Sequence, residues 1–329
     1  MRKNRMKRVI CMGNALVDVL ARVENDDVLT DLSLSEGAMQ LVDDERFCTV
    51  RDAMTAYATE KATGGSAANT ALAMAQLGAR PGFVGSVGAD DDGCFFAHSL
   101  QEHGVQTRLV SSERPTGVAS TFISPDGQRT FATYLGAAAG LTADDLRPDW
   151  LEGYDCLYVE GYLVQNHALI DRAFDLAHAA GLEVGLDLAS YNIVEADYDF
   201  FVHLAKKSDL IFANADEARV FTGKGPHEAV AELARTCRIA VVKNGKLGAI
   251  VQRGDEVVEV PAMEVARVVD TTAAGDFFAA GFLYGLAGGA SLLRSAELGS
   301  LLAGHIIQHV GTALPEAEWC EIRTVVQTL

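Results

Sequence analysis

The stretch Asp-Thr-Thr-Ala-Ala-Gly-Asp at residues 270–276 runs directly into the apolar stretch Phe-Phe-Ala-Ala-Gly-Phe at residues 277–282. Small residues that enter an apolar, helix-compatible segment predict a helix start whose first N–H groups have no partner within the helix. Those amides and the positive end of the helix dipole attract an anion, and small side chains let it approach closely. Asp276, at this join, either caps the helix or acts as a base beside a bound phosphate. The segment alone fits both interpretations.

A second turn of small residues, Thr-Gly-Gly-Ser-Ala-Ala-Asn at residues 63–69, also leads into a predicted helix. Gly64 and Gly65 permit a close approach of the backbone to a ligand. The side-chain amide of Asn69, one turn into the helix, could bind a hydroxyl. The alternative is a tightly packed helix start with Asn69 exposed to solvent.

Asp18 and Arg129 are single charged residues that gain a role if the fold brings them to the same site. Asp18 ends the stretch Gly-Asn-Ala-Leu-Val-Asp, just past the first predicted strand, where a carboxylate can accept hydrogen bonds from a polyol. Arg129 lies in a predicted surface strand and could meet a transferring phosphoryl group if that strand closes over the site. An exposed loop aspartate and an ordinary surface arginine are the alternatives.

Asn214 and Glu217 begin a predicted helix directly after a strand. Their spacing is typical of a capping box, in which each side chain binds a backbone N–H of the first turn. That structural role is sufficient to explain both residues. A functional interpretation adds the ordering of water around Mg²⁺ and phosphate. Lys243 and Gly245 stand at the end of the next strand, close to where a nucleotide phosphate would then lie.

Short apolar runs alternate with amphipathic segments along most of the chain. Near-continuous apolar strands between helices indicate a mostly parallel sheet that helices cover on both faces, which is an α/β fold. We expect strands at residues 9–13, 82–87, 155–160, 182–187, 209–214 and 239–243. We expect helices at residues 66–77, 93–103, 167–180, 215–222, 226–237, 274–286 and 292–309.

Two regions, about 17–42 and 108–134, depart from this alternation. Their apolar residues recur with a period close to two, and Ser-Pro-Asp-Gly at residues 124–127 is typical of a hairpin turn. We interpret the two regions as a small β-sheet that projects from the main sheet of one α/β domain spanning residues 1–329. This lid would lie over the carboxyl ends of the main strands, where open α/β sheets bind ligands.

Composition and missing motifs narrow the function. The chain has 45 acidic and 27 basic residues and a formal net charge of -18, which disfavours a general nucleic-acid-binding protein. No apolar run is long enough to cross a membrane. Six scattered cysteines without a CxxC pair are typical of reduced thiols, so we expect a cytoplasmic protein. The sequence lacks GxxxxGK(S/T), a GxGxxG after the first strand, and GxSxG, which argues against P-loop enzymes, nicotinamide-dependent enzymes and α/β-hydrolases.

Together, these motifs resemble the PfkB, or ribokinase-like, family of carbohydrate and nucleoside kinases. The family's late signature, DTxGAGD, matches residues 270–276 except at Ala273. Two further elements, Gly-Gly-x-x-x-Asn and Asn-x-x-Glu, match at Gly64, Gly65, Asn69, Asn214 and Glu217. Each motif is short, but their order and spacing from residue 13 to about residue 311 make the match specific.

The resemblance implies a ribokinase-like fold and ATP-dependent phosphorylation of a primary hydroxyl. Asp276 would be the catalytic base, and Arg129 would close in from the lid as a second catalytic residue. The backbone amides of Ala273, Ala274 and Gly275 would form an anion hole together with that of Asp276.

The resemblance also implies which residues bind the ligands. ATP and Mg²⁺ would be bound at Asn214, Glu217, Lys243 and Gly245. The hydroxyls of the acceptor would be bound at Asn14, Asp18, Gly64, Gly65 and Asn69. Many relatives also bind a monovalent cation of the K⁺ type, and here the backbone carbonyls of Asp270 and Thr272 would be its ligands. A monomer and a homodimer formed through the lid both fit the sequence.

Residues 13–18, 37–43 and 134–138 resemble the adenosine kinase-like branch of the family, so we expect adenosine as the acceptor and AMP as the product. An apolar slot for the base would come from the lid residues Leu16, Met39 and Phe122, which could equally be ordinary core residues.

Two alternatives to an adenosine kinase remain from the sequence. One is a sugar kinase that acts on ribose, fructose or a related carbohydrate. The other is a sensor that binds a sugar or nucleotide without turnover. Ala273, in place of the usual glycine, motivates the sensor, because its methyl group could crowd a phosphate. The intact Asp276 and Arg129 argue against it.

Overall fold

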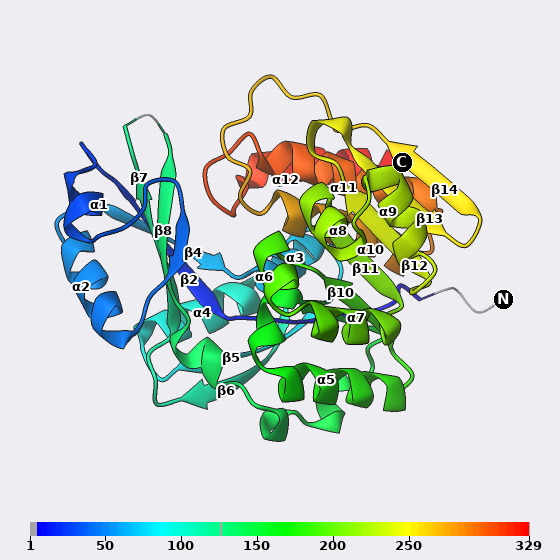
Figure 1. The fold of residues 1–329 in the computed structure, drawn as a ribbon, viewed down its shortest axis with the longest axis horizontal. Coiled ribbons are helices and arrows are strands. Elements are labelled where there is room, and N and C mark those ends of the chain that lie inside the picture. Colours follow the sequence, from blue (N-terminus) through cyan, green and yellow to red (C-terminus); the bar gives the residue numbers. More distant parts are fainter. Residues whose placement is uncertain (1–4, 126, 329) are drawn as a thin grey trace.

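The computed structural model describes residues 5–125 and 127–328 and contains two β-sheets (Figure 1). The larger sheet has nine strands in the order β14-β13-β12-β11-β10-β9-β1-β5-β6. Neighbours from β12 to β6 are parallel, and β13 and β14 continue the sheet antiparallel at one edge. The strands are β1 (Val9–Met12), β5 (Gly82–Gly88), β6 (Gln106–Ser112), β9 (Cys156–Glu160), β10 (Glu183–Asp187), β11 (Leu210–Asn214), β12 (Ile239–Lys243), β13 (Ala249–Arg253) and β14 (Glu256–Val260).

Helices cover both faces of this sheet, which explains why its central strands are apolar at nearly all interior positions. In β1, Val9 and Cys11 belong to the core on one face, and Ile10 and Met12 belong to the core on the other. The first face carries α3 (Ser66–Gln76), α4 (Asp91–Glu102), α10 (Ala274–Ala287), α11 (Leu292–Ile306) and α12 (Glu316–Thr328). The second carries α5 (His167–Ala179), α6 (Tyr191–Ala196), α7 (Tyr198–Lys206), α8 (Ala215–Thr222) and α9 (Pro226–Leu233). The prediction of an α/β fold is confirmed, and each of the six strands and seven helices expected from the sequence is present.

Short 3₁₀ helices complete the connections. They are η1 (Gly136–Gly140), η2 (Ala143–Asp145), η3 (Pro148–Leu151), η4 (Gly161–Gln165) and η5 (Gly245–Leu247). Within the described ranges, none of the helices combines the length and the apolar character needed to cross a membrane.

The smaller sheet is the lid, at the left of Figure 1, and its five strands have the order β3-β8-β7-β2-β4. They are β2 (Leu16–Arg22), β3 (Met39–Leu41), β4 (Thr59–Gly64), β7 (Gly117–Ile123) and β8 (Arg129–Tyr134). The expected segments 17–42 and 108–134 are therefore wrong in two places. β4 belongs to the lid because it pairs with β2, and β6 belongs to the main sheet because it pairs with β5.

β7 and β8 pair antiparallel, as expected for a hairpin, although its turn includes Asp126, which lies outside the described residues. The two faces of the lid sheet differ. Ala21, Phe122 and Ala132 pack on one face with α1 (Asp27–Asp31) and α2 (Asp44–Met54). The opposite face lines a cavity above the main sheet.

Candidate active site

The cavity has a volume of about 960 Å³ and lies between the lid sheet, the carboxyl ends of the main strands and the start of α10. Most of the residues predicted from the sequence line it, although they come from segments far apart in the chain. These are Asn14, Leu16, Asp18, Met39, Gly65, Asn69, Asn214, Glu217, Lys243, Gly245, Thr272, Ala273, Ala274, Gly275 and Asp276.

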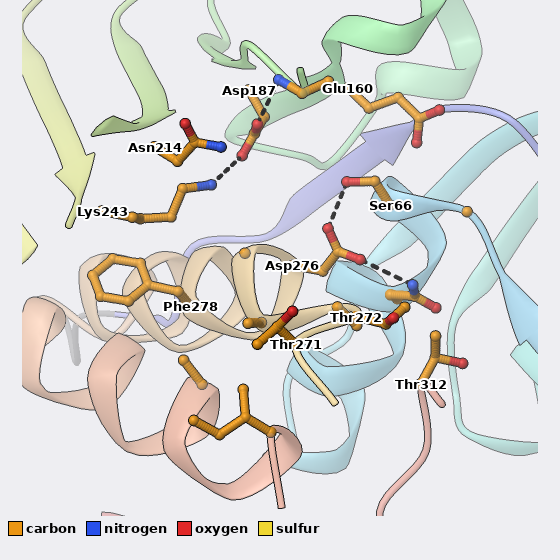
Figure 2. Close-up of a pocket in the computed structure, with 18 of the residues that line it drawn as sticks. Ser66, Glu160, Asp187, Asn214, Lys243, Thr271, Thr272, Asp276, Phe278 and Thr312 are labelled. Atoms are coloured by element: carbon orange, nitrogen blue, oxygen red, sulfur yellow. Dashed lines mark hydrogen bonds and ion pairs between the residues drawn. The ribbon is translucent and has the colours of Figure 1, made fainter. Parts of the chain in front are cut away.

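Asp276 lies in the first turn of α10 and points toward α3 (Figure 2). Ser66 Oγ donates to its Oδ1 at 2.7 Å, and Asn69 Nδ2 donates to its Oδ2 at 2.9 Å. Burial raises the pKa of Asp276 to about 6, although these two hydrogen bonds oppose the rise. The Asp276 side chain accepts its bonds from another helix, so the helix-cap interpretation does not describe it.

Ala273 is the N-cap of α10 and has a left-handed backbone, with φ 60° and ψ 2°. Glycine adopts this conformation freely, whereas an alanine side chain costs about 1–2 kcal/mol there. The glycine usual at this position in the resembled family is thus explained by the backbone. The Ala274 amide donates to the Thr271 carbonyl at 3.2 Å, while Gly275 and Asp276 lie in the first turn, where a helix supplies no carbonyl partner for N–H groups.

Gly64 and Gly65, at the end of the lid strand β4, lie directly against the Asp18 side chain and the Asn14 backbone. A Cβ at position 64 would come within 2.2 Å of Asp18 Oδ1. At position 65, where φ is 93°, a Cβ would come within 2.1 Å of the Asn14 carbonyl. Burial and the charge of Asp276 raise the pKa of Asp18 to about 7. The two glycines therefore make room for Asp18 and Asn14 beside the cavity.

Asn14 is bound to Glu160, a buried carboxylate at the end of β9. Glu160 Oε1 accepts from the Asn14 backbone N at 2.9 Å and from Asn14 Nδ2 at 2.8 Å. Its Oε2 accepts from the Ala67 backbone N at 2.8 Å. Burial raises the pKa of Glu160 to about 7, and these three donors oppose the rise.

At the other end of the cavity, Lys243 Nζ lies 3.1 Å from Asp187 Oδ2 (Figure 2). Burial would lower the pKa of Lys243, but the carboxylates of Asp187 and Glu217 outweigh it and raise the pKa above its usual value. The Lys243 ammonium group is also next to the first turn of α10, because a Cβ added at Gly275 would lie 3.1 Å from Lys243 Nζ.

Asn214 and Glu217 form the predicted capping box at the start of α8. Asn214 Oδ1 accepts from the Glu217 amide, and Glu217 Oε2 accepts from the Asn214 amide. Both residues also line the cavity. Burial raises the pKa of Glu217 to about 7, against the opposing charge of Lys243.

Arg129 of the lid strand β8 reaches the loop before α10. Its Nη1 lies 2.7 Å from Asp270 Oδ2 and 3.3 Å from Thr272 Oγ1. Asp270 also accepts from the amides of Thr272 and Gly311. Among the described residues, Arg129 Nη2 is buried and has no hydrogen-bond partner. The arginine thus ties the lid to the loop and keeps a donor free.

Phe122 was expected to line a slot for a base, and this expectation is wrong. Its side chain is fully buried in the core between the lid sheet and α2. Side chains alternate along a strand, and Phe122 is three positions from Ala119, which faces the cavity. On the cavity face, the apolar residues are Leu16, Met39, Leu41, Ala119, Phe131 and Leu135.

Sequence reasoning missed Ser66, Glu160 and Asp187. Glu160 and Asp187 end the expected strands β9 and β10 at the edge of the sheet that carries Asn214 and Lys243. The strand-end rule that selected Asn214 and Lys243 could have found both. Ser66 stands between two expected residues, Gly65 and Asn69, at the first position of α3.

Comparisons with known proteins agree with the fold and show the family. The family model described as pfkB family carbohydrate kinase matches residues 32–320. The chain is 28% identical over 265 residues to the 5-dehydro-2-deoxygluconokinase of Geobacillus thermodenitrificans, covering 75% of this chain and 79% of that one. It is 29% identical over 266 residues to the 2-dehydro-3-deoxygluconokinase of Bacillus subtilis, covering 76% and 82%.

Solved structures align over nearly the whole chain. A probable sugar kinase from Rhizobium etli has a TM-score of 0.87 and 34% identity, covering 99% of this chain and 100% of that one. The adenosine kinase from Sinorhizobium meliloti has a TM-score of 0.86 and 34% identity, covering 98% and 99%.

Proposed function

Since the chain belongs to the pfkB family of carbohydrate kinases and is an ATP-dependent kinase that acts on a hydroxyl, we propose that its acceptor is adenosine and its product is AMP. The observation that carries this proposal is the contrast between two parts of the cavity. Asp18, Asn69 and Asp276 form a polar end, and the lid face beside them is apolar. A nucleoside is divided in the same way, because its ribose carries polar hydroxyls and its base offers a flat face to an apolar wall.

The apolar wall suits a base better than it suits a free sugar. Leu41 and Phe131 stand on the neighbouring strands β3 and β8, and Leu16 stands on β2 of the same sheet. Met39 and Leu41 are about half exposed, at 48% and 53%. A base that covers them would remove apolar surface from water. We expect this to contribute on the order of 2 kcal/mol, about 30-fold in kcat/KM, which a pentose or hexose cannot gain.

The polar end suits a neutral acceptor. Asp18, Glu160 and Asp276 are carboxyl groups, and burial together with the charge of Asp276 raises the pKa of Asp18 and of Glu160, so negative charges at this end already oppose one another. Arg129, the cation of the lid beside them, is paired with Asp270. A sugar acid of the gluconate type, as named for the curated relatives, would bring a further negative charge to these carboxylates, whereas adenosine brings none.

The mechanism follows from the proposed roles. Asp18 accepts hydrogen bonds from the ribose hydroxyls, and the buried Oδ1 of Asn69, which has no partner among the described residues, accepts another. Asp276 takes the proton as the 5′ oxygen bonds to the γ-phosphorus and the bond to the β,γ-bridging oxygen breaks. The first-turn amides of α10 and Arg129 Nη2 donate to the charge on the transferring group.

ATP supplies the phosphoryl group and leaves as ADP. The residues at the second end of the cavity fit this ligand and Mg²⁺. Lys243 provides a cation beside α10, while Asp187, Asn214 and Glu217 provide the oxygen atoms that Mg²⁺ prefers. Both Glu217 oxygens already accept from Asn214, so Glu217 would hold the metal through its water. A K⁺-type ion at the carbonyls of Asp270 and Thr272 completes the proposal.

A coupled assay of ADP release tests the acceptor. Adenosine, ribose, fructose and gluconate are compared with ATP and Mg²⁺, and adenosine should give the highest kcat/KM. Replacing K⁺ by tetramethylammonium in the same assay tests the monovalent ion.

The variant Phe131→Ala provides the matched test of the apolar wall. It should lower kcat/KM for adenosine and leave that for ribose unchanged, because only adenosine reaches this side chain. More efficient turnover of ribose or fructose than of adenosine would support the sugar kinase, which the family description and the curated relatives favour.

A further inference from the structure

Glu160 is a buried carboxylate that the proposed mechanism does not use. It ends β9, is 1% exposed and is one of the residues that line the cavity (Figure 2). All three of its described hydrogen-bond donors are N–H groups of the protein, two from Asn14 and one from Ala67. A Cβ at position 13 would come within 2.2 Å of its Oε2, so Gly13 leaves the space that this carboxylate occupies.

The Ala67 amide is the connection to the proposed chemistry. Ala67 is in the first turn of α3, whose N-cap, Gly65, has no side chain to bind the free amides. Glu160 replaces that missing cap with a buried carboxylate, which accepts from the Ala67 amide at the positive end of the helix. It therefore holds the first turn of α3 against the end of β1.

The same turn of α3 positions Asp276. Ser66, directly before Ala67, donates to Asp276 Oδ1, and Asn69, in the same turn, donates to Oδ2. Thr70 Oγ1 donates to the Asp276 carbonyl at 3.3 Å. Two hydrogen bonds therefore link Glu160 to the Asp276 carboxylate. Glu160 accepts one from the Ala67 amide of α3, and α3 donates the other to Asp276 from Ser66 or Asn69.

We propose that Glu160 is a positioning residue for the reaction: by binding Ala67 and Asn14 it fixes the first turn of α3, and through Ser66 and Asn69 it sets the orientation of the Asp276 carboxylate. This inference rests on the proposed role of Asp276 as the base. Glu160 is placed to act on turnover through α3, because all of its described donors are N–H groups of Asn14 and Ala67.

The test is Glu160→Gln, which keeps the shape of the side chain and replaces one acceptor oxygen by an NH₂ group. That group would face an N–H donor of Asn14 or Ala67. We expect kcat to fall about 10- to 100-fold, as for other groups that orient an active side chain, with a smaller change in the KM for the acceptor.

Two comparisons separate positioning from a general structural effect. Glu183→Gln removes a carboxylate from the opposite end of the neighbouring strand, where Glu183 pairs with Lys7 and Arg238, and should leave kcat unchanged. A double-mutant cycle with Ser66→Ala should show that Glu160→Gln costs less once Ser66 no longer binds Asp276. An equal loss in both backgrounds, or a loss confined to KM, would overturn the proposal.

The proposal can still be tested if Glu160→Gln does not fold or if the wild-type protein shows no activity. If Glu160→Gln does not fold, Glu160→Asp keeps the charge but draws it back by one methylene, and should give the same fall in kcat. If the wild-type protein releases no ADP with any acceptor, the proposed function fails. Amide hydrogen exchange of residues 65–70 still tests the bridge in that case, and exchange as slow in Glu160→Gln as in the wild type would contradict it.

Discussion

Asn69 and Asp276 are 207 positions apart in the chain, yet Asn69 Nδ2 donates a hydrogen bond of 2.9 Å to Asp276 Oδ2. The amide group was expected to bind an acceptor hydroxyl. Its nitrogen instead binds the proposed base, while its buried oxygen has no partner among the described residues. One side chain can therefore touch both the acceptor and the group that is proposed to deprotonate it.

Replacing Asp276 by asparagine keeps the shape of the side chain and removes the proposed base. Turnover should fall by roughly two to four orders of magnitude, the usual range for the loss of general-base catalysis, while acceptor binding survives. Steady-state kinetics and calorimetric binding measure the two effects. Near-normal turnover in Asp276→Asn would mean that the carboxylate has a purely structural role.

The wild-type rate should depend on the ionisation of Asp276. Burial raises its pKa to about 6, and a base must be deprotonated to act. In the free enzyme, kcat/KM should therefore rise with pH and reach half of its plateau near pH 6. A profile measured between pH 4.5 and 8 checks this. A rate that is flat across that interval would contradict the role of Asp276 as base.

Asp18 should make the folded state less stable as the pH rises. Its pKa is about 7 in the folded protein and 3.8 when the side chain is not buried. Between these two pH values the folded state binds more protons than the unfolded state, so the free energy of unfolding falls as the pH rises. Asp18→Asn removes this contribution. The free energy of unfolding of the variant, relative to the wild type, should increase from pH 5 to pH 8 in urea titrations. A difference independent of pH would contradict the burial of this carboxylate.

Ala273→Gly should stabilise the protein. Glycine removes the strain of the left-handed backbone at position 273, and we expect a gain of about 1 kcal/mol in the free energy of unfolding. Ala274→Gly is the matched control, because Ala274 is the first helical residue and gains nothing from glycine. Urea unfolding of the two variants decides this, and equal changes in both would rule out strain at 273. Faster turnover in Ala273→Gly would show that the methyl group also crowds the phosphate.

Arg129→Ala should destabilise the protein and slow the reaction. Asp270 is 5% exposed at its side chain, so loss of its partner leaves a buried charge, which costs on the order of 3 kcal/mol. Thr272 and Gly311 keep donating to Asp270 and limit the loss. Thermal and urea unfolding measure the stability. A change below about 1 kcal/mol, typical of exposed ion pairs, would mean that the lid does not hold Arg129 against Asp270 in solution.

Six parallel strands of the main sheet, β1, β5 and β9 to β12, could be predicted because they are largely apolar on both faces and alternate with helices. The antiparallel edge strands β13 and β14 were not expected. The lid was predicted less well. β4 carries the polar run Thr-Glu-Lys at its start, and most of its residues are exposed or half-buried, so it lacks the apolar signal of a strand. Most residues of β6 are partly buried, and its pattern resembles that of the lid although it pairs with β5.

The site could be predicted in part because its short motifs have fixed spacing. Phe122 was misplaced because the sequence shows the alternation of a strand but not which face turns to the cavity. The left-handed backbone at Ala273 could not be predicted, since alanine is not typical of that conformation. The hydrogen bonds from Ser66 and Asn69 to Asp276 join segments about 200 residues apart, and no local pattern encodes such contacts.

The lid joins the main body through four short connections. β1 ends at Met12 before β2 begins at Leu16, and Gly65 alone separates β4 from α3; Ser112 and Gly117, and Tyr134 and Gly136, bound the other two. Each residue spans at most about 3.5 Å of extended chain, so these connections leave the lid little slack. Asp18 pairs with Ala62 in β4, just before Gly65, and Asn69 follows it in α3. A lid movement large enough to release Asp18 from its place would therefore also pull on α3, which donates hydrogen bonds to Asp276. Acceptor binding and the orientation of the base would then change together in one movement of the lid.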